Sequence, residues 1–220
     1  MQSVLFQNRV DAGHKLANRL ARLKQRNESI VIVAIPRGGV IIGDVIATEL
    51  GAGLDIVVSQ KIGAPDNPEF AVGALMPDGS YFLNREHVKM LNISAEYIQM
   101  KANAELSEID RRLKSYRGSK EYHNKFEGKT VVLVDDGIAT GSTILASAKW
   151  LKNNQNCKKL VIAAPVAPED ILDNLKQVTD EVIILDTPEP FIAIGRFYQD
   201  FAQVTDEEVK EIMRKHGYNV

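Results

Sequence analysis

Residues 131–143 read Val131-Val132-Leu133-Val134-Asp135-Asp136-Gly137-Ile138-Ala139-Thr140-Gly141-Ser142-Thr143, and this stretch decides the fold. Its four leading apolar residues, three of them β-branched, are typical of a strand buried on both faces of a parallel sheet. Two acids follow the strand, then a loop bounded by glycines, then a helical pattern of apolar residues through Leu151. This order predicts an α/β domain whose functional loop begins at the end of a buried strand.

The loop from Gly137 to Thr143 has the composition of an anion-binding site. Its two glycines permit a tight turn in which backbone N–H groups converge, and the helix that follows points its positive end at the same place. No lysine follows the second glycine, so the pattern differs from a nucleotide-triphosphate P-loop and suits a monophosphate. An ordinary turn with N-capping hydroxyls would explain Ser142 or Thr143, but not two acids at the end of a buried strand.

Asp135 and Asp136 precede this loop by about the length of one sugar, and carboxylates at that distance accept hydrogen bonds from vicinal hydroxyls. A phosphate site beside a diol site describes a ribose 5-phosphate. The stretch resembles the phosphoribosyl-diphosphate (PRPP) signature of type I phosphoribosyltransferases. The resemblance implies that Asp135 and Asp136 hold the ribose hydroxyls and that seven residues bind the 5-phosphate. These are Gly137, Ile138, Ala139, Thr140, Gly141, Ser142 and Thr143.

A second candidate anion site is Pro36-Arg37-Gly38-Gly39, which follows the apolar strand Ile30–Ile35 and opens a helix. It resembles the pyrophosphate-binding loop of the same family, which implies that Arg37, Gly38 and Gly39 bind the diphosphate of PRPP. The family often carries a non-proline cis peptide in this loop, expected here near Arg37–Gly38. The alternative is a tight turn without a ligand, for which two glycines are also common.

Lys61 is expected to end the next strand, which begins near Leu54, and the resemblance implies that it reaches the departing diphosphate. The alternative interpretation is that Lys61 is a solvated charge at the end of a strand. Residues 62–84 predict a mobile loop followed by a hairpin that turns at Met76–Ser80. The first part of that segment occupies the place of the family's flexible catalytic loop. Glu69 is the candidate there for proton handling.

The tail is aromatic, and in the family a small hood binds the acceptor base by stacking and by reading its edges. The hood is expected from residues 1–14 and 186–220 of this single domain. The acceptor candidates are Phe191, Phe197, Tyr198 and Asp200. The alternative is that these rings seal a small hydrophobic subdomain.

The family reaction is displacement of diphosphate from PRPP by a nitrogen nucleophile, here most simply a nucleobase. It implies Mg²⁺ held by the diphosphate and the ribose hydroxyls near Asp135 and Asp136, with no certain direct protein ligand. Both carboxylates are expected to be ionised. Two other functions remain open: a PRPP- or nucleotide-binding regulator without turnover, and phosphorolysis of a nucleoside or nucleotide in the same pocket. Several segments are also similar to a subgroup of bacterial phosphoribosyltransferase-like proteins that has no secure acceptor. These segments are Gln60–Pro65, Asn67–Phe70 and Thr187–Phe191.

The composition excludes several classes of protein. The chain has 220 residues, a net charge of −2 and interspersed charges, which argues against nucleic acid as a partner and against an anionic membrane. Its single cysteine, Cys157, cannot form a disulfide framework and suits a reducing cytoplasm. A homodimer is the state implied by the resemblance. The hydrophobic periodicity also predicts the remaining helices and strands, at about 10–26, 94–116, 160–165, 169–175, 181–185 and 206–215.

Overall fold

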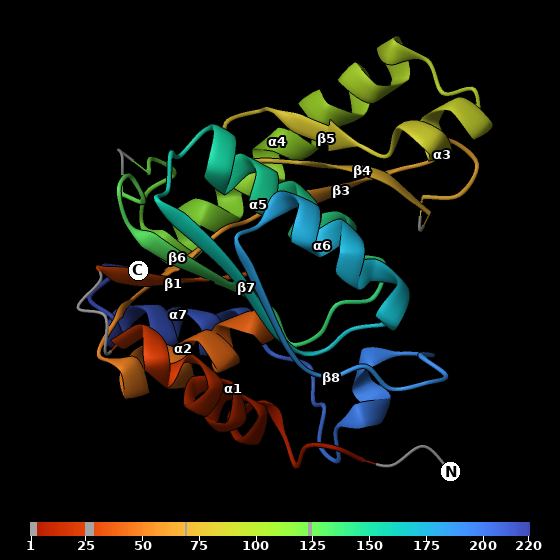
Figure 1. Ribbon diagram of the computed structural model, residues 1–220. Helices are drawn as coiled ribbons and strands as arrows, with labels where there is room; N and C mark the ends of the chain where they lie inside the picture. Colours follow the sequence, from red (N-terminus) through yellow and green to blue (C-terminus); the bar gives the residue numbers. More distant parts are fainter. Residues whose placement is uncertain (1–3, 25–28, 69, 123–124) are drawn as a thin grey trace.

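The computed structural model describes residues 4–24, 29–68, 70–122 and 125–220. Its centre is a parallel sheet with the strand order β2-β1-β6-β7-β8 (Figure 1). All five residues of β6 are buried, which explains its uninterrupted apolar run. The α/β class and the doubly wound sheet are confirmed. The strands are β1 Ile30–Ala34, β2 Gly53–Ile56, β6 Thr130–Val134, β7 Lys159–Val166 and β8 Glu181–Asp186.

The strand order contains one switch point, between β1 and β6. From β1 the chain winds outward to β2, and from β6 it winds the other way to β7 and β8. In open α/β sheets the crevice at such a point, outside the carboxyl ends of the strands, is where ligands bind. The loops after β1 and β6 are the two loops that the sequence marks as anion sites.

Helices cover both faces of this sheet. Figure 1 shows α1, α2 and α7 on one face and α5 and α6 on the other, while α4 contacts both the small sheet and α7. The ends of α4 carry a Ser94 N-cap and a left-handed Gly118, as their sequence predicts. The helices are α1 Arg9–Lys24, α2 Gly38–Leu50, α3 Arg85–Met90, α4 Ala95–Arg117, α5 Ser142–Asn153, α6 Leu172–Val178 and α7 Asp206–Lys215, with short 3₁₀ turns at Glu169–Ile171 and Ile194–Phe197.

A second, antiparallel sheet has the order β3-β4-β5, with β3 Gln60–Gly63, β4 Ala71–Leu75 and β5 Tyr81–Leu83. The predicted hairpin is present, and Met76 N donates to Ser80 O at 2.8 Å across its turn. The expectation that Lys61 ends the strand after Leu54 is wrong. That strand ends at Ile56, and Lys61 lies inside β3 opposite Ala74, because its backbone pairs with the antiparallel strand β4.

The N-terminal segment pairs with the aromatic tail. The N–H groups of Leu5 and Phe6 donate to the carbonyl of Phe197 at 2.9 and 3.0 Å, and Gln199 N donates back to Phe6 O at 2.9 Å. Residues 1–3 of the expected hood lie outside the described residues. These contacts join the N-terminal segment to the stretch 197–199, which reaches the loop after β6 where the Tyr198 hydroxyl donates to Asp136 O at 2.6 Å.

One buried ion pair ties β2 to the end of α4. Asp55 is fully buried, and its two carboxylate oxygens accept from Arg117 Nε at 2.6 Å and Nη2 at 3.1 Å. Lys125 approaches the same carboxylate at 3.2 Å. The Tyr122 ring lies 4.2 Å from the Arg117 guanidinium. The pair therefore joins β2, at the edge of the sheet, to the C-terminal end of α4.

Within the described ranges, no helix is both long enough and apolar enough to cross a membrane.

Candidate active site

The loop after β6 encloses a pocket of about 180 Å³. Its lining runs from Asp135 through Thr143 to Ile144, without Asp136, and is completed by Ile194. Thr140 is exposed, and its hydroxyl lies 3.3 Å from that of Ser142. Since α5 begins at Ser142 without a side-chain cap, the positive end of the helix faces a pocket rimmed with hydroxyls. This is the environment that a phosphate group prefers.

Both glycines of this loop are required by close approach. Gly141 has φ +73°, and a Cβ atom there would lie 2.0 Å from Cδ1 of Ile171. At Gly137 a Cβ atom would lie 2.5 Å from Cγ2 of Ile194. The loop is also fixed to the neighbouring strand, because Ile138 N donates to Val166 O at 2.8 Å. The loop is therefore packed against the side chains of Ile171 and Ile194 and bonded to the backbone of β7.

Asp135 lines this pocket and Asp136 follows it in the chain, and each is partly exposed. The Asp136 backbone N–H donates to Asp135 Oδ1 at 2.8 Å. Burial raises the pKa of Asp135 well above its usual value, and the neighbouring Asp136 charge raises it further. Burial also raises the pKa of Asp136, against the lowering effect of a hydrogen bond from Arg9. Burial thus opposes the expected ionisation of both carboxylates, and more strongly at Asp135 than at Asp136.

Arg9 lies in the N-terminal segment expected to form part of the hood, but the sequence assigned it no role at Asp136. Its Nε donates to Asp136 Oδ2 at 2.7 Å, and this ion pair is largely buried. Its Nη1 donates to Ala202 O at 2.8 Å, and its guanidinium lies 3.8 Å from the centre of the Phe201 ring. Tyr198 reaches the same acid from the tail, with its hydroxyl donating to Asp136 O at 2.6 Å. In the sequence, Arg9 looks like any charge at the start of an amphipathic helix.

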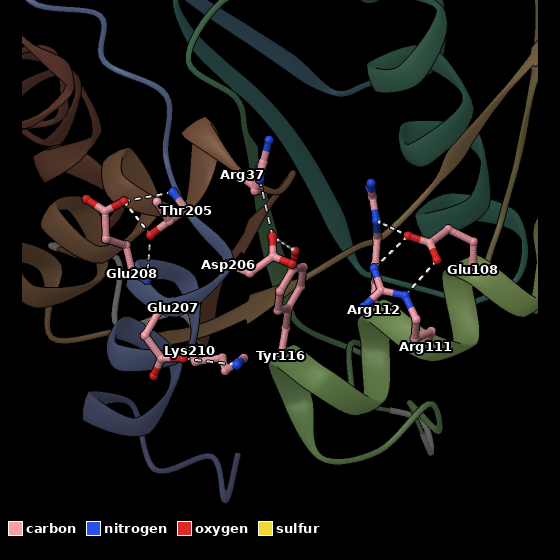
Figure 2. A network of polar contacts seen from close by, with 10 residues as sticks. All are labelled: Arg37, Glu108, Arg111, Arg112, Tyr116, Thr205, Asp206, Glu207, Glu208 and Lys210. Carbon is pink, nitrogen blue, oxygen red and sulfur yellow. Dashed lines mark hydrogen bonds and ion pairs between the residues drawn. The ribbon is translucent and has the colours of Figure 1, made fainter.

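The loop after β1 lies directly against this acid pair. A Cβ atom at Gly38 would lie 1.8 Å from Asp136 Oδ2, and one at Gly39 would lie 3.0 Å from the Asp135 Cα. The non-proline cis peptide is present at Pro36–Arg37, one bond before the position expected from the family. Arg37 points toward α7, where its Nη1 lies 3.3 Å from Asp206 Oδ1 (Figure 2). The two glycines thus allow the second loop to approach the carboxylates closely.

Two expected residues are not part of this geometry. Lys61 lies on β3 of the small sheet with an exposed side chain. Glu69 lies outside the described residues. The site as described therefore consists of the two loops, the acid pair and the supports that reach them from α1 and the tail.

The four expected acceptor residues lie in three different environments. Phe197 and Tyr198 are buried, packed against Phe191 at 5.1 Å and Phe6 at 5.3 Å between ring centres, which favours the alternative that they seal the hood. Asp200 is exposed and accepts from Ala202 N at 3.1 Å in a turn. Phe191 instead lines an open groove next to the phosphate loop.

That groove has a volume of about 440 Å³ and shares Ala139 and Thr140 with the pocket of the phosphate loop. Its wall comes from the segments that follow β7 and β8, at the carboxyl edge where sheet topology places ligands. Sequence reasoning named only Phe191 of its outer wall, although the position after a strand was a usable signal. The remaining lining residues are Pro168, Asp170, Ile171, Asn174 and Ile192.

Comparison with known proteins agrees with this geometry. The sequence model of the phosphoribosyl transferase domain matches residues 5–187. The chain belongs to the phosphoribosyl transferase family. It is 38% identical over 205 residues to a Mycobacterium tuberculosis protein named "Putative phosphoribosyl transferase Rv0571c", covering 93% of this chain and 45% of that protein. The chain thus spans about half the length of the curated relatives it matches first.

Two further proteins are similar to this chain, one in structure and one in sequence. The crystal structure of TT1426 from Thermus thermophilus superposes with a TM-score of 0.78 and 34% identity, covering 96% of this chain and 98% of that one. A ribose-phosphate pyrophosphokinase from a Marinomonas species is 38% identical over 89 residues, which is 39% of this chain and 28% of that protein. The phosphoribosyltransferase-type fold therefore extends over nearly the whole chain.

Proposed function

We propose that this member of the phosphoribosyl transferase family transfers 5-phosphoribose from PRPP to a nitrogenous acceptor, most simply a nucleobase, and releases diphosphate. One observation carries the proposal: the loops after β1 and β6 meet at the switch point with the acid pair between them, so closely that Gly38 has no room for a Cβ atom. Two anion loops separated by two carboxylates match the order of groups in PRPP, which are diphosphate, ribose diol and 5-phosphate.

Each loop receives a defined role in this proposal. Residues 137–143 hold the 5-phosphate with backbone N–H groups, hydroxyls and the positive end of α5. Arg37, Gly38 and Gly39 bind the diphosphate, with Arg37 supplying a forked, permanently charged contact. Asp135 and Asp136 accept hydrogen bonds from the ribose hydroxyls. Fixing the sugar at three points holds C1 in place for attack, which contributes rate through positioning.

In the transfer step, a nitrogen lone pair of the acceptor forms a bond to ribose C1. The bond from C1 to the diphosphate oxygen breaks, and its electron pair leaves with the diphosphate. The acceptor nitrogen then loses a proton. The negative charge of Asp136, held by Arg9, lies on the side of the sugar where positive charge develops, and it stabilises that charge. The groove lined by Phe191 lies next to the phosphate loop and receives the acceptor.

Magnesium fits this site through the substrate. Among the residues that the structure describes, no three His, Cys, Asp or Glu side chains gather as a metal cluster. Asp135 lines the pocket and offers carboxylate oxygen, the donor type that Mg²⁺ prefers. When bound with PRPP, the ion neutralises the charge of the leaving diphosphate. We further propose that the protein is cytoplasmic, that it forms a homodimer and that its partners are small molecules.

The first experiment is a calorimetric titration of PRPP into the protein with and without Mg²⁺. We expect magnesium-dependent binding that is lost in the double variant Asp135→Ala/Asp136→Ala. A matched control is Asp170→Ala, which removes an exposed acid from the neighbouring groove and should leave PRPP binding intact. If PRPP does not bind the wild-type protein under any condition, the proposal is wrong.

The second experiment identifies the reaction. Nucleobases and other amines are incubated with PRPP, and diphosphate release is measured. Release that depends on one acceptor class supports transfer. Binding of PRPP without release for any acceptor would instead favour a regulatory module. Release of a base from nucleosides or nucleotides with phosphate or diphosphate would favour phosphorolysis.

A further inference from the structure

We propose that Asp206 and Tyr116 are positioning residues that hold the Arg37 guanidinium ready for the diphosphate group. The inference rests on the proposed function, because it gives Arg37 a diphosphate to bind. It concerns the first residue of α7 and a buried tyrosine of α4, neither of which belongs to the two loops or the acid pair. Figure 2 shows the three side chains meeting between α2, α4 and α7.

The contacts form a series that begins at the buried Tyr116 and ends at the long side chain of Arg37. The Tyr116 ring is 1% exposed within the core, and its hydroxyl donates to Asp206 Oδ1 at 2.6 Å. The same oxygen accepts from Arg37 Nη1 at 3.3 Å. The short contact fixes the carboxylate, while the longer one leaves the guanidinium able to adjust. A guanidinium has five N–H donors, so this contact uses one and leaves the planar fork suited to phosphate oxygens.

Asp206 is also held from its own backbone. Thr205 caps α7, and its hydroxyl accepts from Glu208 N at 3.2 Å while Glu208 Oε2 accepts from Thr205 N at 2.7 Å. This reciprocal capping box sets the position of Asp206, the first of the two residues between them. Asp206 therefore meets Arg37 from a fixed helix end and not from a loop.

The charges agree with this arrangement. The hydrogen bond from Tyr116, followed by the bond and charge of Arg37, lowers the pKa of Asp206. Burial and the neighbouring Asp206 carboxylate raise the pKa of Tyr116 to about 12. At neutral pH, Asp206 is thus an anion that accepts from two donors, and Tyr116 keeps the proton that it donates.

Two arginines of α4 near this cluster pair with a different carboxylate. On α4, Glu108 Oε2 accepts from Arg111 Nε at 2.7 Å, and Glu108 Oε1 accepts from Arg112 Nε at 2.9 Å (Figure 2). The carboxylate of Asp206 is therefore directed to Arg37. A partly exposed pair of this kind adds little to folding stability, so its main consequence is the geometry that it gives to a long side chain.

The test measures the affinity for inorganic diphosphate and for PRPP by calorimetry in wild type, Asp206→Ala, Asp206→Asn and Tyr116→Phe. We expect Asp206→Ala to weaken both ligands by about 2- to 12-fold, the effect of immobilising one side chain rich in rotamers. Asp206→Asn keeps the accepting oxygen and should lose less. In turnover the loss should appear in KM for PRPP, with little change in kcat.

Two controls show whether the effect passes through Arg37. In an Arg37→Ala background, Asp206→Ala should cause no further loss. Glu207→Gln removes the adjacent charge of α7, which pairs with Lys210 and Arg214 at 3.0 Å and not with Arg37, so it should leave diphosphate affinity unchanged. Tyr116→Phe keeps the ring in the core and tests the same contact should Asp206→Ala fold poorly.

Three outcomes would overturn the inference: unchanged affinity in the Asp206 and Tyr116 variants, an equal loss in the Arg37→Ala background, or tighter binding in Asp206→Ala. The last would mean that Asp206 competes with the ligand for Arg37. If wild type binds neither PRPP nor diphosphate, the proposed function fails together with this inference. If wild type binds both and the variants behave like it, only the positioning role is lost.

Discussion

At Gly38 the carboxylate of Asp136 occupies the space that a Cβ atom would need, 1.8 Å away. The residue type at one loop is therefore dictated by a side chain on another loop far along the chain. The sequence predicted that Gly38 and Asp136 both serve the site. It did not predict that they touch, because composition and spacing describe each loop separately. The ion pair of Arg9 with Asp136, 2.7 Å between Nε and Oδ2, was not predicted for the same reason.

The raised pKa of Asp135 leads to a prediction about pH. Burial raises its pKa in the folded chain above the unfolded value of about 3.9, so the folded state binds this proton more tightly. Its contribution to the free energy of unfolding is thus fully present below the unfolded pKa and is lost as pH rises through the folded pKa. Asp135→Asn removes this titration. Without ligand and with chelator, we expect the Tm of the variant minus that of wild type to be more positive at about pH 8 than at about pH 4.

The measurement is thermal unfolding followed by circular dichroism across that range. Asp170→Asn provides the control, since it changes an exposed carboxyl at the edge of the same site. A difference in Tm that stays constant with pH would show that Asp135 is ionised in the folded protein.

At the scale of elements, β6 and its following helix were predictable because the information is local. An apolar run, two acids and a glycine loop fix strand, turn and helix within one short stretch, residues 131–143. The strand β3 was not predictable, because Lys61 adopts strand conformation through its pairing with Ala74 of β4. The caps of α4 and α7 were predictable for the opposite reason, because Ser94, Gly118 and Thr205 act on their own neighbours.

The junction of β2 and α4 gives a prediction about stability. Asp55→Ala leaves the Arg117 guanidinium buried without its carboxylate, and breaking a buried pair in this way costs about 3–5 kcal/mol. Asp110→Ala removes an exposed pair with Lys120 at 3.0 Å and should cost about 0–1 kcal/mol. Urea unfolding of both variants measures the two free energies of unfolding. Equal, small losses would show that the buried pair is dispensable.

At the scale of the whole molecule, the site joins distant parts of the chain. Arg9 lies 127 positions from Asp136, Tyr116 lies 90 from Asp206, and Arg37 lies 169 from Asp206. Sequence reasoning predicted the ligand-facing loops and the fold, but none of these supports. Contacts over such separations depend on how sheet, helices and tail pack, which no local pattern records.

The Arg9 contact gives a prediction that distinguishes binding of the ribose from binding of the diphosphate. Arg9→Ala removes a hydrogen bond and a positive charge that lower the pKa of Asp136, and a hydrogen bond to a charged group is worth about 1.5–3 kcal/mol. We expect PRPP affinity to fall by about tenfold or more, while inorganic diphosphate, which has no ribose, loses less than about twofold. Arg19→Ala changes an exposed arginine of the same helix and serves as control. Equal losses for both ligands would place the effect of Arg9 on the diphosphate loop instead.

The tail that supplies Tyr198, Ala202 and Asp206 begins after residue 187, where the match to the family ends. Part of the support of the site thus lies outside the stretch that the family model matches, while Arg9 and Tyr116 lie inside it. Substitutions after residue 187 can change how firmly Asp136 and Arg37 are held while leaving every motif residue in place. Two relatives with identical loops need not share the same ligand affinity, and their divergence is to be sought in the C-terminal segment.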